Sequence, residues 1–157
     1  MTNHSSNTAA EKPALKPANE NPWYCLATLY GEQPQNGFDA ELASKNRDGW
    51  NNWVVAIAPD GNRLKDKNDH ILINQQLQMN QIIKKFESRT NGRMMPDTLR
   101  TEIISLSNLN FDNAVNFERF VFPLPVTFNN SIFQADTTFL FAHLLKDAIF
   151  RIVYLKS

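Results

Sequence analysis

Glycine and cysteine are both scarce in this chain of 157 residues, and each scarcity excludes a class of structure. The one cysteine, Cys25, cannot form a disulfide within the chain, and a single thiol is typical of a reducing compartment. No glycine follows Gly92, although tight hairpin turns favour glycine. We therefore expect neither a disulfide-stabilised fold nor a C-terminal region made of ordinary β-hairpins.

The sequence also lacks an excess of charge of either sign and any long hydrophobic run. Sixteen basic and sixteen acidic residues cancel. A nucleic-acid-binding protein usually carries a basic excess, so we expect no nucleic-acid partner. The longest uncharged apolar run, 139–145, is far shorter than the ~20 residues of a membrane helix. We expect a cytoplasmic protein with no membrane contact, because residues 1–20 lack the apolar segment of a secretory signal; an unconventional export signal there is the alternative.

Sequence motifs of common catalytic and metal sites are absent. The chain contains no GxxxxGK[ST], GxGxxG, HExxH or CxxC pattern. His4, His70 and His143 stand apart from one another, and Cys25 between Tyr24 and Leu26 is typical of a packed apolar residue. We therefore expect no enzymatic activity, no catalytic residues, no cofactor and no metal.

The chain is predicted to begin with a disordered tail over residues 1–20, which have no hydrophobic period. Structure is expected to start at Asn21 and Pro22, because asparagine suits a helix cap and proline the first helical position. This first helix is expected to stop at Gly31. Its apolar face consists of Trp23, Leu26, Ala27 and Tyr30.

Two further helices are predicted from apolar residues spaced three and four apart. One runs from Asp39 to the turn sequence at 59–62, and the other from Asn74 to about Arg89. Together with the first helix and a connector they form a predicted helical module, residues 21–100. Its large buried residues are expected to be Trp23, Trp50, Trp53 and Phe86.

A ladder of large apolar residues follows in the C-terminal third, with alternating steps of six and five residues. Neither a helix nor a strand has this period, and self-similarity at a fixed period marks a repeat architecture. Two alternatives remain: a plain antiparallel sheet, and an amphipathic helix over residues 139–155. The ladder consists of Phe111, Phe117, Phe122, Phe128, Phe133, Phe139, Leu144, Phe150 and Leu155.

Small or amide residues stand just before several ladder positions. Asparagine precedes two of them, at Asn110 and Asn116, and alanine lies two before two others, at Ala142 and Ala148. This pattern resembles the pentapeptide-repeat proteins, whose repeats have a central Leu or Phe. Residues 21–33 and 43–51 also look like the N-terminal module of bacterial, Phe-centred members.

The resemblance implies an α+β protein with a short, right-handed, four-sided β-helix over residues 104–157. Four faces of five, six, five and six residues make a coil of about 22 residues, so the chain holds about two coils. Such a short solenoid needs caps, and the helical module is predicted to cap its N-terminal end through Trp23, Trp50, Trp53 and Phe86. The C-terminal end, near Ile152 and Val153, has no evident cap, so a homodimer through this end is expected.

The function that the resemblance implies is a non-enzymatic interaction or scaffold module with an unidentified protein partner and no cofactor. One alternative is a DNA mimic that binds DNA gyrase, but four acidic and four basic residues follow Phe111, which disfavours it. A second is a secreted effector or phage-encoded interactor that uses residues 1–20 for delivery. A third is an enzyme with a pocket between the helices and the coil.

Overall fold

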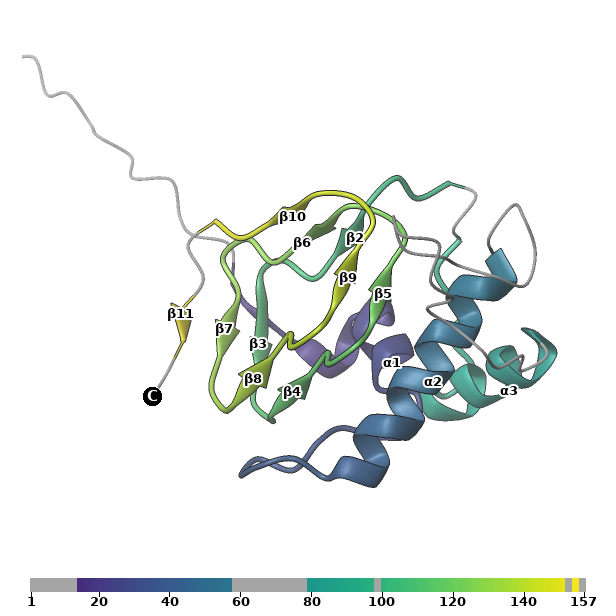
Figure 1. The fold of residues 1–157 in the computed structure, drawn as a ribbon, viewed down its shortest axis with the longest axis horizontal. Coiled ribbons are helices and arrows are strands. Elements are labelled where there is room, and N and C mark those ends of the chain that lie inside the picture. The colour runs from purple at the N-terminus through teal and green to yellow at the C-terminus, as the bar shows by residue number, and fades with distance from the viewer. Residues whose placement is uncertain (1–13, 58–78, 98–99, 152–153, 156–157) are drawn as a thin grey trace, which may run out of the picture.

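The structure is a computed structural model that describes residues 14–57, 79–97, 100–151 and 154–155. It is an α+β arrangement in which a small helical part lies beside short parallel strands in stacked sheets (Figure 1). The helical part contains a 3-10 helix η1 (Ala18–Glu20) and helices α1 (Pro22–Ala27), α2 (Ala40–Ile57) and α3 (Met79–Arg89). The strands are β1 (Lys16–Pro17), β2 (Ile104–Ser105), β3 (Leu109–Phe111), β4 (Val115–Asn116), β5 (Val121–Phe122), β6 (Val126–Thr127), β7 (Ile132–Phe133), β8 (Thr137–Thr138), β9 (His143–Leu144), β10 (Ala148–Ile149) and β11 (Tyr154–Leu155).

Helix α1 begins as the sequence predicts but ends earlier. The Asn21 Oδ1 accepts hydrogen bonds from the backbone N–H groups of Trp23 at 2.9 Å and Tyr24 at 3.1 Å, and Pro22 is the first helical residue. The helix ends at Ala27, so the expectation that it continues to Gly31 is wrong. Thr28 leaves the helical conformation while its hydroxyl donates to the Tyr24 carbonyl at 2.7 Å, a bond that competes with continued helix.

Helices α2 and α3 lie where two helices are predicted. The Asp39 Oδ1 accepts from the backbone N–H of Leu42 at 2.9 Å and caps α2. After α3, Asn91 and Gly92 have φ of 54° and 83°, a left-handed turn that stops the helix. The predicted start of the third helix at Asn74 and the turn at 59–62 lie outside the described residues. No helix among the described residues is long and apolar enough to cross a membrane.

Part of the N-terminal tail has regular structure. Strand β1 pairs in parallel with β3, with Lys16 opposite Leu109, and the Lys16 N–H donates to the Asn108 carbonyl at 3.0 Å. Ala18 in η1 is buried. The expectation of a disordered tail is therefore wrong for residues 14–20, because their backbone has a strand to pair with. Residues 1–13 lie outside the described part of the chain.

The strands from β2 onward form a strand stack in which every pairing has the same sequence offset. Ile104 lies opposite Val126, and Val126 lies opposite Ala148. We call the sequence distance between two such paired residues one register step of the stack. Every pairing described is parallel, which contradicts the antiparallel alternative, and β9 to β11 contradict the helix over residues 139–155. The four sheets have the strand orders β1-β3-β7-β11, β2-β6-β10, β4-β8 and β5-β9.

The backbone of the strand stack also repeats at half a register step, which is every eleventh residue. Four residues at this spacing have positive φ values between 54° and 58°. A left-handed residue lets the chain change direction sharply, and asparagine tolerates it better than most residues. The corners are therefore built by backbone conformation in the absence of glycine. These residues are Asn108, Arg119, Asn130 and Phe141.

The early ladder residues fill the interior of the stack, and equivalent rings one register step apart contact each other. Phe111 stacks on Phe133 with ring centroids 4.4 Å apart, and Phe128 stacks on Phe150 at 4.9 Å. Ladder residues that are at most 1% exposed are Phe111, Phe117, Phe122, Phe128 and Phe133.

Burial decreases towards the end of the ladder. Phe139 is half-buried, whereas Leu144 is 47% exposed and Phe150 is 50% exposed. The expectation that Leu144 and Phe150 belong to the buried core is therefore wrong. They lie in the last part of the strand stack, where no following strand covers them among the described residues. Leu155 pairs in register with Phe133, and its side chain lies outside the described structure.

Candidate interaction surface

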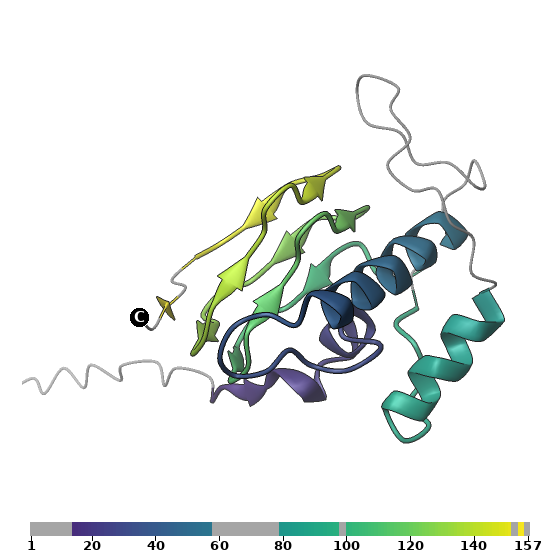
Figure 2. The ribbon, with the colours of Figure 1, turned by 60° about the horizontal axis from the view of Figure 1, so that its bottom comes forward.

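The helical module lies at the N-terminal end of the strand stack. Figure 2 shows α1 and α2 beside the strands that come first in the sequence, while β9 and β10 lie on the far side. Strands β2, β3, β4 and β5 have backbone groups that point away from the next layer, towards this end. Strand edges of this kind bind other chains unless they are covered. The groups that cover each edge therefore determine which surface remains free to bind a partner.

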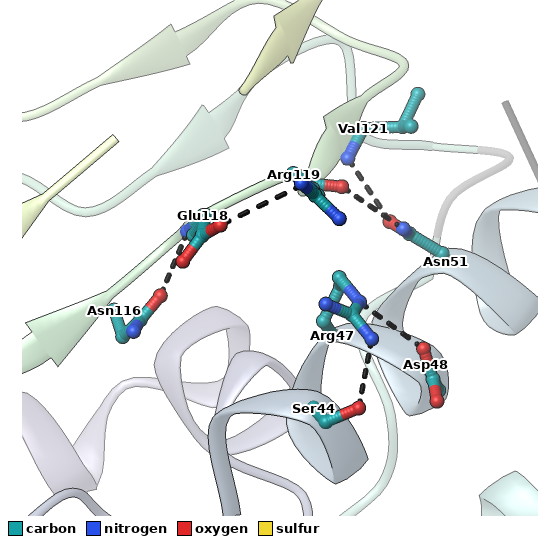
Figure 3. A network of polar contacts seen from close by, with 8 residues as sticks. All are labelled: Ser44, Arg47, Asp48, Asn51, Asn116, Glu118, Arg119 and Val121. Atoms are coloured by element: carbon teal, nitrogen blue, oxygen red, sulfur yellow. Dashed lines mark hydrogen bonds and ion pairs between the residues drawn. The ribbon is translucent and has the colours of Figure 1, made fainter. Parts of the chain in front are cut away.

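Side chains from α2 occupy the edge of β5. The Asn51 Oδ1 accepts from the Val121 N–H at 3.0 Å, and the Asn51 Nδ2 donates to the Arg119 carbonyl at 3.1 Å (Figure 3). The neighbouring Trp50 Nε1 donates to the Val121 carbonyl at 2.7 Å. Both backbone polar groups of Val121 are thus satisfied by one helix.

The other three edges at this end also have partners from the N-terminal part of the chain. Strand β1 covers β3, as described above. The Asn21 Nδ2 donates to the Ser105 carbonyl of β2 at 3.0 Å, and the Ala114 N–H, just before β4, donates to the Pro34 carbonyl at 3.2 Å. Each of the four sheets therefore has a polar contact with the N-terminal part of the chain at this end.

Ring contacts join the helical module to the ladder. Trp50 lies 5.7 Å from Phe120 and 5.5 Å from Phe122, and Tyr24 lies 5.2 Å from Phe111, all between ring centroids. The N-terminal end of the strand stack is thus closed by aromatic side chains as well as by hydrogen bonds.

The predicted cap residues have different positions within this arrangement. Trp50 contacts the ladder directly, while Trp23 contacts Trp53 and Trp53 contacts Trp50, with centroids 5.7 and 4.9 Å apart. Phe86 is fully buried in α3, which packs against α1 and α2. Sequence reasoning missed the Tyr24 ring and the Asn51 amide as cap groups.

Charged groups near the N-terminal end have partners close by. Arg47 donates to the Ser44 hydroxyl at 2.7 Å and to Asp48 at 3.2 Å, both on its own helix (Figure 3). Glu118 lies 3.6 Å from Arg119. These pairs are partly exposed, so each contributes little to stability and is weakened by salt.

The last described part of the strand stack carries exposed apolar side chains, which we name the open-end patch. Charged residues of both signs are exposed in the same part of the chain: Asp136, Lys146, Asp147 and Arg151. Five of the exposed large apolar residues lie within residues 140–150. The patch consists of Leu140 (55% exposed), Phe141 (63%), Leu144 (47%), Leu145 (39%) and Phe150 (50%).

Groups with chemical reactivity are dispersed or protected. His143 is half-buried in β9, and His4 and His70 lie outside the described residues. Cys25 is buried, its Sγ donates to the Asn19 carbonyl at 3.1 Å, and burial raises the pKa of its thiol. The described part of the chain contains no group of three or more side chains that could hold a metal ion.

A shallow hollow of about 300 Å³ lies on the helical module, between Tyr30 and the start of α2. Its charged residues already have partners: Lys45 lies 2.6 Å from Glu41, and Asp39 caps α2. The hollow is lined by residues of the helical module and by none of the ladder residues. Its position differs from that of the pocket between helices and coil that an enzyme was expected to use.

Comparison with known proteins finds no similar protein. The chain matches no protein-family model, no curated protein and no solved structure.

Proposed function

We propose that this chain is a non-enzymatic pentapeptide-repeat protein that acts in the cytoplasm as a protein–protein interaction or scaffold module. The observation that carries the proposal is the difference between the two ends of the strand stack. One end is closed by hydrogen bonds and aromatic rings from the helical module, whereas the other presents the open-end patch. Exposed apolar surface is the usual mark of a binding surface.

The finer fold in this proposal is a right-handed, four-sided β-helix over residues 104–157. The constant register step supports it, because four short faces of alternating five and six residues add up to the offset between paired strands. The left-handed corners at every eleventh residue support it too, since eleven residues correspond to two faces. In Figure 1 the four sheets lie on four sides of a common interior, as four faces of a coil would.

Surface charge favours an ordinary protein partner over a role as a DNA mimic. Between residues 111 and 151, four acidic residues are accompanied by three basic ones, and exposed residues of both signs lie near the open-end patch in the sequence. A mimic of DNA needs a field of one sign. Apolar contact at the open end is therefore the stronger basis for binding.

The proposal is tested by capture of partners on the immobilised full chain. A Phe141→Glu/Leu145→Glu variant places two charges in the patch at exposed positions, and Lys84→Glu on the exposed face of α3 is the matched control. We expect proteins retained by the wild type and by Lys84→Glu to be lost from the double variant. Equal retention by all three proteins, or none by any, would overturn the open end as the binding surface.

A further inference from the structure

We infer that Asn36, in the loop between α1 and α2, is a site of spontaneous deamidation that converts its side-chain amide to the carboxylate of aspartate or isoaspartate. This modification is independent of the proposed function, because it requires no partner. It depends on the Asn-Gly sequence at this position and on the surroundings that the fold gives to that sequence.

Deamidation of asparagine begins with attack by the backbone nitrogen of the next residue. The Gly37 nitrogen, after loss of its proton to solvent, forms a C–N bond with the Asn36 Cγ, while the Cγ–Nδ2 bond breaks and ammonia leaves. Water then opens the cyclic succinimide at either of its carbonyl groups, which gives aspartate or isoaspartate. Glycine favours this ring closure because it has no Cβ to obstruct the approach and adopts many backbone conformations.

The sequence contains two Asn-Gly pairs, Asn36-Gly37 and Asn91-Gly92, and the structure distinguishes them. A Cβ built on either glycine would meet open space, so access by solvent does not separate the two pairs. The Gly92 N–H, however, donates to the Glu87 carbonyl at 2.8 Å, and Asn91 has a φ of 54°, in the turn that ends α3. The second pair must therefore open this turn before its nitrogen can attack.

The first pair has no such restraint within the described part of the chain. Asn36 is exposed, and neither its side-chain amide nor the Gly37 N–H has a hydrogen-bond partner among the described residues. Figure 1 shows the loop, in dark blue, extending away from the two helices that it joins. The attacking nitrogen and the reacting amide are therefore both available in the folded protein.

The same loop makes contacts on both sides of Asn36 that depend on its length. The Asp39 N–H, next to the start of α2, donates to the Gln33 Oε1 at 2.7 Å, and the Pro34 carbonyl accepts from the Ala114 N–H at the β4 edge at 3.2 Å. Isoaspartate at position 36 carries the backbone through its Cβ and lengthens the loop by one methylene. We therefore expect the modification to weaken the contact between Gln33 and Asp39 and the cover that Pro34 gives to the β4 edge.

The first test follows both Asn-Gly pairs by peptide mapping with mass spectrometry while the folded full chain is incubated at neutral and at mildly alkaline pH. We expect conversion of Asn36 to be about tenfold faster than that of Asn91, because the second pair must first lose its hydrogen bond. Alkaline pH should accelerate both conversions, since the glycine nitrogen reacts after it loses its proton. In concentrated urea the two rates should be similar, because the turn that protects Asn91 is then absent.

Asn36→Gln is the matched variant, because its longer side chain disfavours ring closure while it keeps the amide. It should abolish conversion at this position and leave the rate at Asn91 unchanged. No conversion of Asn36 in the folded wild type, or conversion of Asn91 at an equal or higher rate, would overturn the inference.

The second test compares hydrogen exchange in wild-type and Asn36→Gln proteins after the same incubation. The amides of Asp39 and Ala114 should exchange about threefold to tenfold faster in the incubated wild type, as expected when one hydrogen bond is weakened. The Val121 amide, which Asn51 holds, is the internal control and should exchange at the same rate in both proteins. Equal exchange at Asp39 and Ala114 in a converted sample would overturn the effect on the loop contacts.

Discussion

The side chain of Asn51 pairs with the backbone of Val121 as a neighbouring strand would. Its Oδ1 accepts from the Val121 N–H at 3.0 Å, and its Nδ2 donates to the Arg119 carbonyl at 3.1 Å. A side-chain amide carries the same donor and acceptor as a peptide group, so it can satisfy an edge without a strand. Asn51 is buried and Val121 is 1% exposed, so water is a poor substitute for this contact.

Replacement of Asn51 is therefore expected to destabilise the protein. Asn51→Leu leaves the Val121 N–H unsatisfied in a buried position, which costs about 1–3 kcal/mol. The measurement is the free energy of unfolding in urea. Asn36→Leu, at an exposed residue between α1 and α2, is the control and should change this free energy little. An equal effect of the two substitutions would contradict the role assigned to the Asn51 amide.

Trp50 supplies a second, independent contact with the same strand. Trp50→Phe keeps a large ring near Phe120 and Phe122 but removes the Nε1 donor from the Val121 carbonyl. We expect a loss of about 1–3 kcal/mol, measured in the same urea titration. The double variant with Asn51→Leu should deviate from additivity, because both contacts hold one residue of β5. Strict additivity would indicate that the two side chains act on separate parts of the structure.

Ladder positions one register step apart should differ in their sensitivity to truncation. Phe128 is fully buried against four other phenylalanine rings, and Phe150 is 50% exposed. Phe128→Ala should cost about 3–5 kcal/mol, and Phe150→Ala clearly less. Similar losses at both positions would contradict the gradient of burial along the ladder.

Several parts of the fold follow from particular residues of the sequence. Asn21 with Pro22 and Asp39 predict the starts of α1 and α2, because capping is a local property of the chain. The alternating spacing of the ladder predicts a repeat, and the parallel pairing of Phe111 with Phe133 agrees with its period. Leu106 lies five residues before Phe111 and is 1% exposed. The same alternating spacing therefore extends the ladder by one step, to Leu106.

Other parts of the fold depend on contacts that no sequence pattern indicates. Lys16 and Pro17 form a strand too short for any period, and they pair through the backbone. Asn51 looks like any helical asparagine, since its partners are backbone groups. Phe120 occupies a position where the repeat favours a small residue, and it is fully buried because Trp50 packs against it from the helical module.

The left-handed conformation of the corner residues predicts how stability changes when arginine and asparagine replace each other there. Arg119 and Asn130 have φ of 58° and 56° at equivalent corners, and asparagine tolerates this conformation better than arginine. Arg119→Asn should therefore raise the free energy of unfolding, by up to about 1 kcal/mol, and Asn130→Arg should lower it. Thermal and urea denaturation of both variants measure the effect. A change of the same sign in both variants would contradict the role of backbone conformation at these corners.

Alkaline pH should destabilise the protein through Tyr24. Burial raises the pKa of its hydroxyl far above the ordinary value near 10, and the charge of Glu32 and a hydrogen bond to it raise the pKa further. The folded protein therefore keeps this proton at a pH where the unfolded chain releases it. Below about pH 10 both states hold the proton, and above it stability falls by up to about 1.4 kcal/mol per pH unit.

The check is the free energy of unfolding as a function of pH for the wild type and Tyr24→Phe. At neutral pH the variant should be less stable, because it loses the hydrogen bond to Glu32. Between about pH 10 and 11 the difference should shrink, since the variant has no hydroxyl to ionise at this position. Cys25, whose pKa is also raised by burial, is present in both proteins and cancels in the difference. A difference that stays constant with pH would show that the Tyr24 hydroxyl ionises equally in the folded and unfolded states, which is incompatible with its burial beside Phe111 at the closed end of the strand stack.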